Sequence, residues 1–136
     1  MIEGAQEILF QVHGDQRGSL VAIESWENID FEMKRIYFIY DTNPDAVRGK
    51  HAHRNLKQVL LCVHGQCDIL LDNGKEQEIV TLNEANKGIY LTGFIWREMM
   101  HFSEDCVLIA IVDHEYDPLD YIYDRSALQN EGGEIL

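Results

Sequence analysis

The stretch GKHAHRNLKQVLLCVHG, residues 49–65, decides the fold class of this chain. Two histidines, His51 and His53, stand one residue apart ahead of an apolar run that ends at a glycine turn. Residues two apart on a strand point to the same face of the sheet, so the two imidazoles are predicted to lie side by side. In a small β-barrel that shared face can be the interior, where the pair could hold a metal, move protons or simply pack.

Strand signals continue on both sides of this stretch. Nine segments are rich in β-branched, aromatic or alternating residues, namely 8–13, 19–25, 33–41, 57–63, 66–72, 75–82, 87–92, 95–102 and 106–113. Between them lie turn residues, of which Asn73-Gly74 predicts a type I′ hairpin. The spacing predicts one all-β domain over residues 1–136, an antiparallel sandwich or barrel. We expect a short helix or tail at about 117–130, and the tail at about 125–136 is compatible with a linker to a further domain.

The charge balance excludes two broad classes of partner. With 24 acidic and 11 basic residues, the net charge is −13, which argues against general binding to nucleic acid or to an anionic membrane. Four of the cations nevertheless fall within ten residues around the histidine pair: Arg48, Lys50, Arg54 and Lys57. This concentration favours a small anionic ligand, or it is only a solvated edge.

The cysteines and the lack of long apolar segments indicate the cellular compartment of the protein. Cys62, Cys67 and Cys106 are odd in number and lie in apolar runs, which is typical of buried free thiols in a reducing compartment. No apolar run approaches the roughly 18 residues of a membrane span, and the first residues lack the pattern of a signal peptide. We therefore expect a cytoplasmic protein without a membrane partner.

The stretch 49–65 resembles the first motif of the cupin barrel, which has a glycine, two histidines one residue apart, a carboxylate and a later glycine. Gln58 occupies the region of the glutamate of metal-binding cupins, and Arg97, in the similar stretch 88–102, occupies about the place of the third histidine. Glutamine is a weak neutral ligand and arginine is always protonated, so two imidazoles remain where catalytic sites usually offer three ligands. We expect no metal; His101, four residues after Arg97, is the alternative ligand.

A closer resemblance is to the nucleotide-sugar 3,4-ketoisomerases, metal-free cupins that act on dTDP-4-keto-6-deoxyglucose. It rests on segments in the same order, at 15–24, 31–42, 48–53, 57–74, 88–99 and 106–124, including the Trp-x-Glu-Met element at 96–99. The resemblance implies a cupin (double-stranded β-helix, or jelly-roll) barrel and a homodimer that can exchange N-terminal strands. It also implies a cofactor-free conversion of a dTDP-linked 4-keto-6-deoxy sugar to its 3-keto isomer in deoxyamino-sugar biosynthesis.

The residues fit that chemistry. The hydrogen on C3, next to the C4 ketone, is weakly acidic, so a base can remove it while an acid assists the enolate oxygen, and an enediol then collapses to the C3 ketone. Histidine suits both roles near pH 7. We expect His51 to be the base, on the resemblance, with His53 as its partner. Tyr37 is the third candidate, since the family draws on a tyrosine from this strand; structural histidines and a packing tyrosine are the alternatives.

Substrate-binding candidates follow from the charge and shape of a nucleoside diphosphate. Arginine gives bidentate contacts to phosphate, which makes Arg17, Arg35, Arg48 and Arg97 candidates alongside Gln58. Strict alternation turns Arg48 away from the His51 face unless Gly49 bends the strand. Trp96 could stack on the thymine base, or it could be a buried core residue.

Other functions remain open at this point. A nucleotide-sugar 3,5-epimerase uses the same scaffold and residue types, a binding cupin would hold the nucleotide sugar without turnover, and a metal-dependent oxygenase or isomerase would need a bound ion. The C4 configuration of the product, gluco or galacto, depends on which face of the enediol receives a proton, and the sequence does not specify it.

Overall fold

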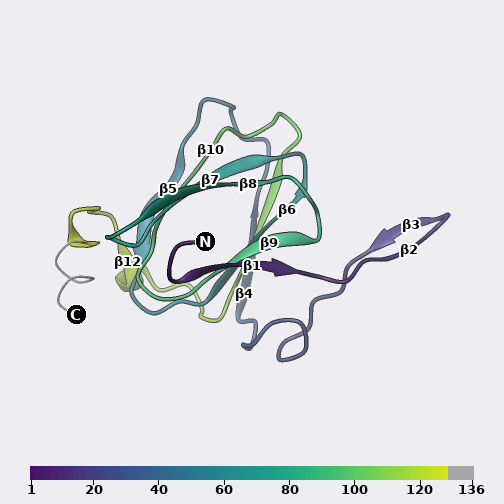
Figure 1. The fold of residues 1–136 in the computed structure, drawn as a ribbon, viewed down its shortest axis with the longest axis horizontal. Coiled ribbons are helices and arrows are strands. Elements are labelled where there is room, and N and C mark those ends of the chain that lie inside the picture. The colour runs from purple at the N-terminus through teal and green to yellow at the C-terminus, as the bar shows by residue number, and fades with distance from the viewer. Residues whose placement is uncertain (129–136) are drawn as a thin grey trace.

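The computed structural model describes residues 1–128 as two antiparallel five-stranded sheets that face each other, with a hairpin projecting from one end (Figure 1). One sheet has the order β1-β9-β6-β11-β4 and the other β12-β5-β10-β7-β8. The strands are β1 (Ala5–Leu9), β2 (His13–Asp15), β3 (Gly18–Leu20), β4 (Arg35–Ile39), β5 (Arg48–His53), β6 (Gln58–His64), β7 (Cys67–Asp72), β8 (Gln77–Leu82), β9 (Lys87–Leu91), β10 (Trp96–Met100), β11 (Val107–Val112) and β12 (Tyr121–Ile122). The predicted all-β jelly-roll barrel is confirmed.

Strand β6 shows how the sequence fills the barrel. Gln58, Leu60 and Cys62 point into the space between the sheets, and the intervening Val59 and Leu61 pack in a second apolar cluster on the outer face. A strand buried on both faces reads as a continuous apolar run, which is how this one appears in the sequence. Among residues 1–128, the buried polar side chains gather around one end of β5, β6 and β10, namely His51, His53, Gln58 and Arg97.

The first two strands differ from their predicted ranges. β1 spans Ala5–Leu9 instead of 8–13, and β3 spans Gly18–Leu20 instead of 19–25. Phe10 leaves the ladder because its side chain is buried in the outer cluster, while its N–H donates to the carbonyl of Asn86 (2.8 Å). Val21 and Ile23 cover the same cluster as an irregular segment. Apolar residues here therefore cover a sheet without forming a strand.

The hairpin between β7 and β8 is also wider than predicted. Gly74 has a positive φ of 92°, but Asn73 does not take the left-handed conformation that a type I′ turn requires. Instead, Asn73 Oδ1 accepts from the N–H groups of Lys75 and Glu76 (2.9 and 2.8 Å). The side chain thus stabilises a four-residue turn over 73–76.

The C-terminal stretch returns to the polar end of the barrel. A 3-10 turn, Pro118–Asp120, follows Asp117, whose carboxylate accepts from the N–H of Leu119 (3.0 Å). β12 then pairs with β5, with Tyr121 opposite His53. In the stretch predicted as a short helix or tail, at about 117–130, the 3-10 turn and β12 reach residue 122, and helical residues follow at 127 and 128. Residues 129–136 of the predicted tail lie outside the described residues. Within residues 1–128, no helix is long and apolar enough to cross a membrane.

Candidate active site

A β-bulge at the start of β5 sets the direction of the two histidines. Arg97 and Glu98 are neighbours on β10 but oppose His51 and Gly49, which leaves Lys50 as an extra residue. Gly49 and Lys50 both have positive φ, 82° and 52°. A Cβ at Gly49 would lie 3.0 Å from the carbonyl oxygen of Arg97, so glycine suits both the φ and the close approach. The strand is therefore irregular at Gly49, although Arg48 before it stays exposed.

Beyond the bulge, His51 and His53 lie side by side inside the barrel. They are 8% and 2% exposed, and their ring centroids are 4.8 Å apart. Tyr121 of β12 packs on both rings, with centroid distances of 4.9 and 4.5 Å. The pairing predicted from the one-residue spacing is therefore confirmed.

Each imidazole has one hydrogen-bonded nitrogen and one nitrogen without a partner. His53 Nδ1 lies 3.0 Å from Asp120 Oδ2, and His51 hydrogen-bonds to the backbone of Gly49. Among residues 1–128, the Nε2 atoms of His51 and His53 are the only buried side-chain nitrogen or oxygen atoms without a partner. A buried polar atom without a partner costs free energy and is uncommon, so two such atoms in contact rings indicate a place for a ligand.

Burial also fixes the protonation state of the pair. Loss of solvent lowers the pKa of His51 to about 4, with a further contribution from the charge of Arg97. The pKa of His53 falls to about 2, mainly through burial and also through the charges of Arg97, His51 and Arg35. Both rings are neutral at pH 7, and with Nδ1 carrying the hydrogen, each Nε2 can accept a proton.

A hydrogen-bonded chain of three side chains lies beside the histidines. Arg97 is 2% exposed and donates to the carbonyl of Ile95 through Nε and NH2 (3.2 and 3.0 Å), and to Gln58 Oε1 through NH1. Gln58 Nε2 in turn donates to the hydroxyl oxygen of Tyr37 (3.0 Å). Burial lowers the pKa of Arg97 to about 10, so the guanidinium stays charged at neutral pH.

Tyr37 is a neutral phenol at this position. Burial raises its pKa, and because its oxygen accepts from Gln58, its own O–H is free to donate to another oxygen. The guanidinium of Arg35, two residues earlier on β4, lies 4.6 Å from the Tyr37 ring centroid and 5.0 Å from that of Tyr116. Six of the nine predicted residues thus lie at this end of the barrel, namely His51, His53, Tyr37, Gln58, Arg97 and Arg35.

The other three predicted residues lie elsewhere. Trp96 points to the outer face of β10, where it is buried against Ala52 and Ile122 and donates to Glu98 Oε2 (2.8 Å). Arg17 is 85% exposed on the β2–β3 hairpin, which projects away from β5 and β12 (Figure 1), and it pairs with Asp15. Arg48 is exposed at the start of β5. Within one chain, these side chains do not join the histidine pair.

The alternative metal ligand, His101, is also elsewhere. Its side chain is exposed, and its Nδ1 lies 2.7 Å from Asp68 Oδ2. Gln58, the other candidate, is held by Arg97 and Tyr37. In the part of the chain that the structure describes, the two imidazoles belong to no group of three metal-ligating side chains.

Asp120 is the residue that the sequence reasoning missed. Its Oδ1 accepts from the N–H groups of Arg54 and Asn55 (2.9 and 3.0 Å), and its Oδ2 faces His53. It lies 67 residues from His53 along the chain, in a segment with several acidic residues and tyrosines, so no spacing rule connects the two. A carboxylate held by two backbone N–H groups is rigid, and it fixes the tautomer of the imidazole.

Comparison with known proteins identifies the family of this chain. A family model described as FdtA: WxcM-like, C-terminal, matches residues 3–132. TDP-4-oxo-6-deoxy-alpha-D-glucose-3,4-oxoisomerase of Aneurinibacillus thermoaerophilus is 46% identical over 108 residues, which is 79% of this chain and 78% of that protein.

Solved structures agree as well. The sugar 3,4-ketoisomerase QdtA of Thermoanaerobacterium thermosaccharolyticum, in complex with TDP, is 35% identical with a TM-score of 0.96, covering 100% of this chain and 99% of QdtA. A 3,4-ketoisomerase of Helicobacter canadensis is 40% identical with a TM-score of 0.89, over 93% of this chain and 95% of that one. The chain belongs to the FdtA family of WxcM-like, C-terminal domains, and the sugar 3,4-ketoisomerases are its relatives.

Proposed function

We propose that this isomerase of the FdtA family converts TDP-4-keto-6-deoxyglucose into its 3-keto isomer. One observation carries the proposal: the Nε2 atoms of His51 and His53, adjacent, buried, neutral and without partners. Proton acceptors placed close together suit a reaction that moves protons between neighbouring carbons and oxygens. The relatives that match over most of the chain are named for this reaction, which supports the choice of substrate.

In the proposed reaction, His51 Nε2 takes the proton from C3, and the electron pair of that C–H bond forms the C3–C4 double bond. The carbonyl oxygen on C4 becomes an enolate oxygen and then accepts a proton, which gives the enediol. Loss of the proton on O3 returns the carbonyl to C3, and C4 receives a proton. The sugar gains and loses no atoms, so no oxidant is needed.

The neighbouring groups have separate proposed roles. His53, held by Asp120, exchanges the protons of O3 and O4, because its Nε2 lies beside that of His51 on the same face of β5. Tyr37 donates its free O–H to the enolate oxygen. The buried guanidinium of Arg97 stabilises the negative charge that develops there, since a fixed charge in a dry site acts strongly.

The test is incubation of the purified protein with TDP-4-keto-6-deoxyglucose, followed by proton NMR. We expect new signals of a 3-keto sugar and, in deuterated water, exchange of the C3 hydrogen. A product epimerised at C3 or C5 with the carbonyl still at C4 would identify an epimerase instead. Bound but unchanged substrate would identify a binding protein. The same spectra give the C4 configuration of the product.

We also propose a homodimer with exchanged N-terminal strands as the active form. The outer face of the β4–β11–β6 sheet carries an apolar groove of about 650 Å³, lined by residues such as Ile36, Val63 and Ile109 together with Val12 and Val21 beside the projecting hairpin. A partner seated there would cover this face. Exchange would also give Arg17 a route to a second active site.

Light scattering tests the dimer, with an expected mass of two 15.7 kDa chains at micromolar concentration. An Ile36→Glu substitution, which places a charge on the groove, should shift the mass to the monomer; the same change at exposed Ile79 of β8, outside the groove, is the control. A monomeric wild type would disprove the proposal.

The three free cysteines support a reducing location such as the cytoplasm.

A further inference from the structure

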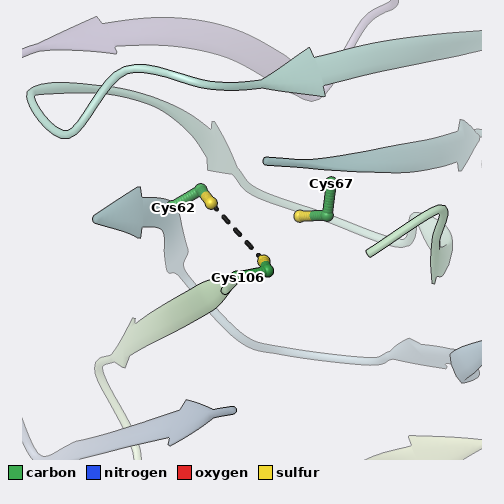
Figure 2. Close-up of side chains that lie close together, drawn as sticks. All are labelled: Cys62, Cys67 and Cys106. Carbon is green, nitrogen blue, oxygen red and sulfur yellow. Dashed lines mark hydrogen bonds between the residues drawn. The ribbon is translucent and has the colours of Figure 1, made fainter. Parts of the chain in front are cut away.

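Three thiols converge inside the barrel, away from the histidines. Cys62 of β6, Cys67 of β7 and Cys106 just before β11 are 1%, 1% and 3% exposed, and their sulfur atoms all lie within 4.8 Å of one another. The Sγ atoms of Cys62 and Cys106 are 3.5 Å apart. Figure 2 shows the three side chains, from three separate segments, directing their sulfurs into one shared space.

These distances match a three-sulfur coordination site. With a metal–sulfur bond of about 2.3 Å, three sulfurs in one plane around an ion lie about 4.0 Å from each other. The observed upper limit of 4.8 Å and the 3.5 Å pair bracket that separation. Small rotations about the Cα–Cβ bonds would therefore bring the sulfurs to bonding distance without a change of the backbone.

The ligand set selects the kind of ion. Thiolates are soft ligands that favour Cu(I) and zinc over magnesium or calcium. Structural zinc sites are closed by four protein ligands, but among residues 1–128 no histidine, carboxylate or fourth thiol joins these three side chains. Cu(I) is a d10 ion without a fixed geometry and accepts three sulfur ligands. We propose that Cys62, Cys67 and Cys106 form a binding site for a single Cu(I) ion.

Binding of the ion is coupled to the loss of thiol protons. Thiolates are the metal-binding form of cysteine, so the ion displaces the thiol protons as it binds. The affinity is therefore expected to fall as the pH falls.

An ion can reach the cluster by local opening of two surface turns. Cys67 follows the turn at Gly65 and Cys106 follows the turn at Ser103, and the turns are joined by hydrogen bonds between Ser103 and Gln66 (both 2.9 Å). At Gly65 a Cβ would lie 2.3 Å from Ser103 Oγ, so the turns are closely packed. We expect opening of these turns to expose the thiols while most of both sheets stays paired.

The cluster is separate from the proposed active site. Cys62 lies four residues after Gln58 on β6, which at about 3.3 Å per residue places it roughly 13 Å along the strand. Substitution of the cysteines is therefore expected to leave ketoisomerase turnover unchanged. The copper test and the function test can fail independently.

The experiment is anaerobic titration of the full chain with Cu(I), supplied as its acetonitrile complex, in competition with the chelator bicinchoninate. We expect one Cu(I) per chain and, by X-ray absorption of the wild type, a shell of three sulfurs at about 2.3 Å. Each of the variants Cys62→Ala, Cys67→Ala and Cys106→Ala should bind at least about 100-fold more weakly, the upper end of the loss seen for an outer-shell partner. The chain has three cysteines in all, so any copper left in the variants is held by other side chains.

Four results would overturn the proposal. One is a nitrogen or oxygen shell in the wild-type absorption spectrum, which needs no variant to fold. Another is unchanged affinity in a folded Cys67→Ala variant, as judged by circular dichroism. The third is Zn²⁺ binding that the same three cysteines hold against equimolar Cu(I). Failure of the wild type to take copper from bicinchoninate would show that the thiols only pack.

Discussion

Acidification should destabilise this protein through its two buried histidines, over a range where carboxylates contribute little. In the unfolded chain each imidazole has a pKa of about 6.5. In the folded chain the pKa is about 4 for His51 and about 2 for His53. A folded-state pKa below the unfolded value means that the unfolded state binds more protons between the two, so stability falls as the pH falls.

The size of the effect follows from those pKa values. From about pH 6.5 down to about pH 4.5, protonation of the unfolded chain lowers the free energy of unfolding by about 2 kcal/mol for each histidine, or by about 4 kcal/mol for the pair. Domain stabilities are about 5–15 kcal/mol, so this loss is a large share of the total. Above about pH 7 the contribution is complete, and no further gain is expected.

Urea unfolding at several pH values, at one fixed protein concentration, measures this dependence. We expect His53→Asn to remove about half of the loss between about pH 6.5 and about pH 4.5, and His51→Asn about the same. His13→Asn, on the exposed strand β2, is the matched control and should behave as the wild type. If both buried-site variants kept the full wild-type dependence, the claim that these imidazoles are neutral through burial would be refuted.

Three further predictions concern the reaction. His51→Asn should lower turnover by about 10²–10⁴-fold and abolish C3 exchange in deuterated water, whereas His53→Asn should slow carbonyl transfer more than C3 exchange; equal losses of both would show one coupled unit. Asp120→Asn keeps an oxygen that accepts from the backbone N–H groups, but it presents an N–H to His53 in place of a carboxylate oxygen. Turnover should therefore fall by about 10²-fold or more with little change in Tm. An unchanged rate would contradict the positioning role of Asp120. Arg97→Met removes a positive charge that lowers the pKa of His53, so this pKa should rise in an NMR titration, and turnover should slow. An unchanged pKa of His53 would show that burial alone lowers it.

The barrel and half of the site were predictable because local pattern carries them. The continuous apolar runs of β6 and β11 predict buried strands, the period of a strand puts His51 and His53 on one face, and Gln58 and Arg97 follow from their places in the motif. Trp96 was ambiguous, because alternation puts it on the face opposite Arg97 and only the packing of β12 buries that face. Asp120 was beyond reach, since the contact with His53 depends on a C-terminal segment that returns across the barrel mouth.

The same limit applies to the three cysteines. The turn between Cys62 and Cys67 suggests that these two can face each other, and the structure confirms their proximity. Cys106 joins them only because β11 pairs with β6 across 44 positions of sequence. Contacts between distant segments depend on topology, which a short pattern does not encode.

The segment beyond the bulge at Lys50 is sensitive to its length. Because facing alternates along a strand, deleting Ala52 would turn His51 and His53 to opposite sides of the sheet, whereas deleting Lys50 would remove the bulge and keep His51 opposite Arg97. Substitutions at Lys50, whose side chain is exposed, leave the register intact. In a mutational library of this gene, insertions and deletions at codons 51–53 should be lost from the active pool, while most amino-acid exchanges at codon 50 that tolerate a positive φ survive.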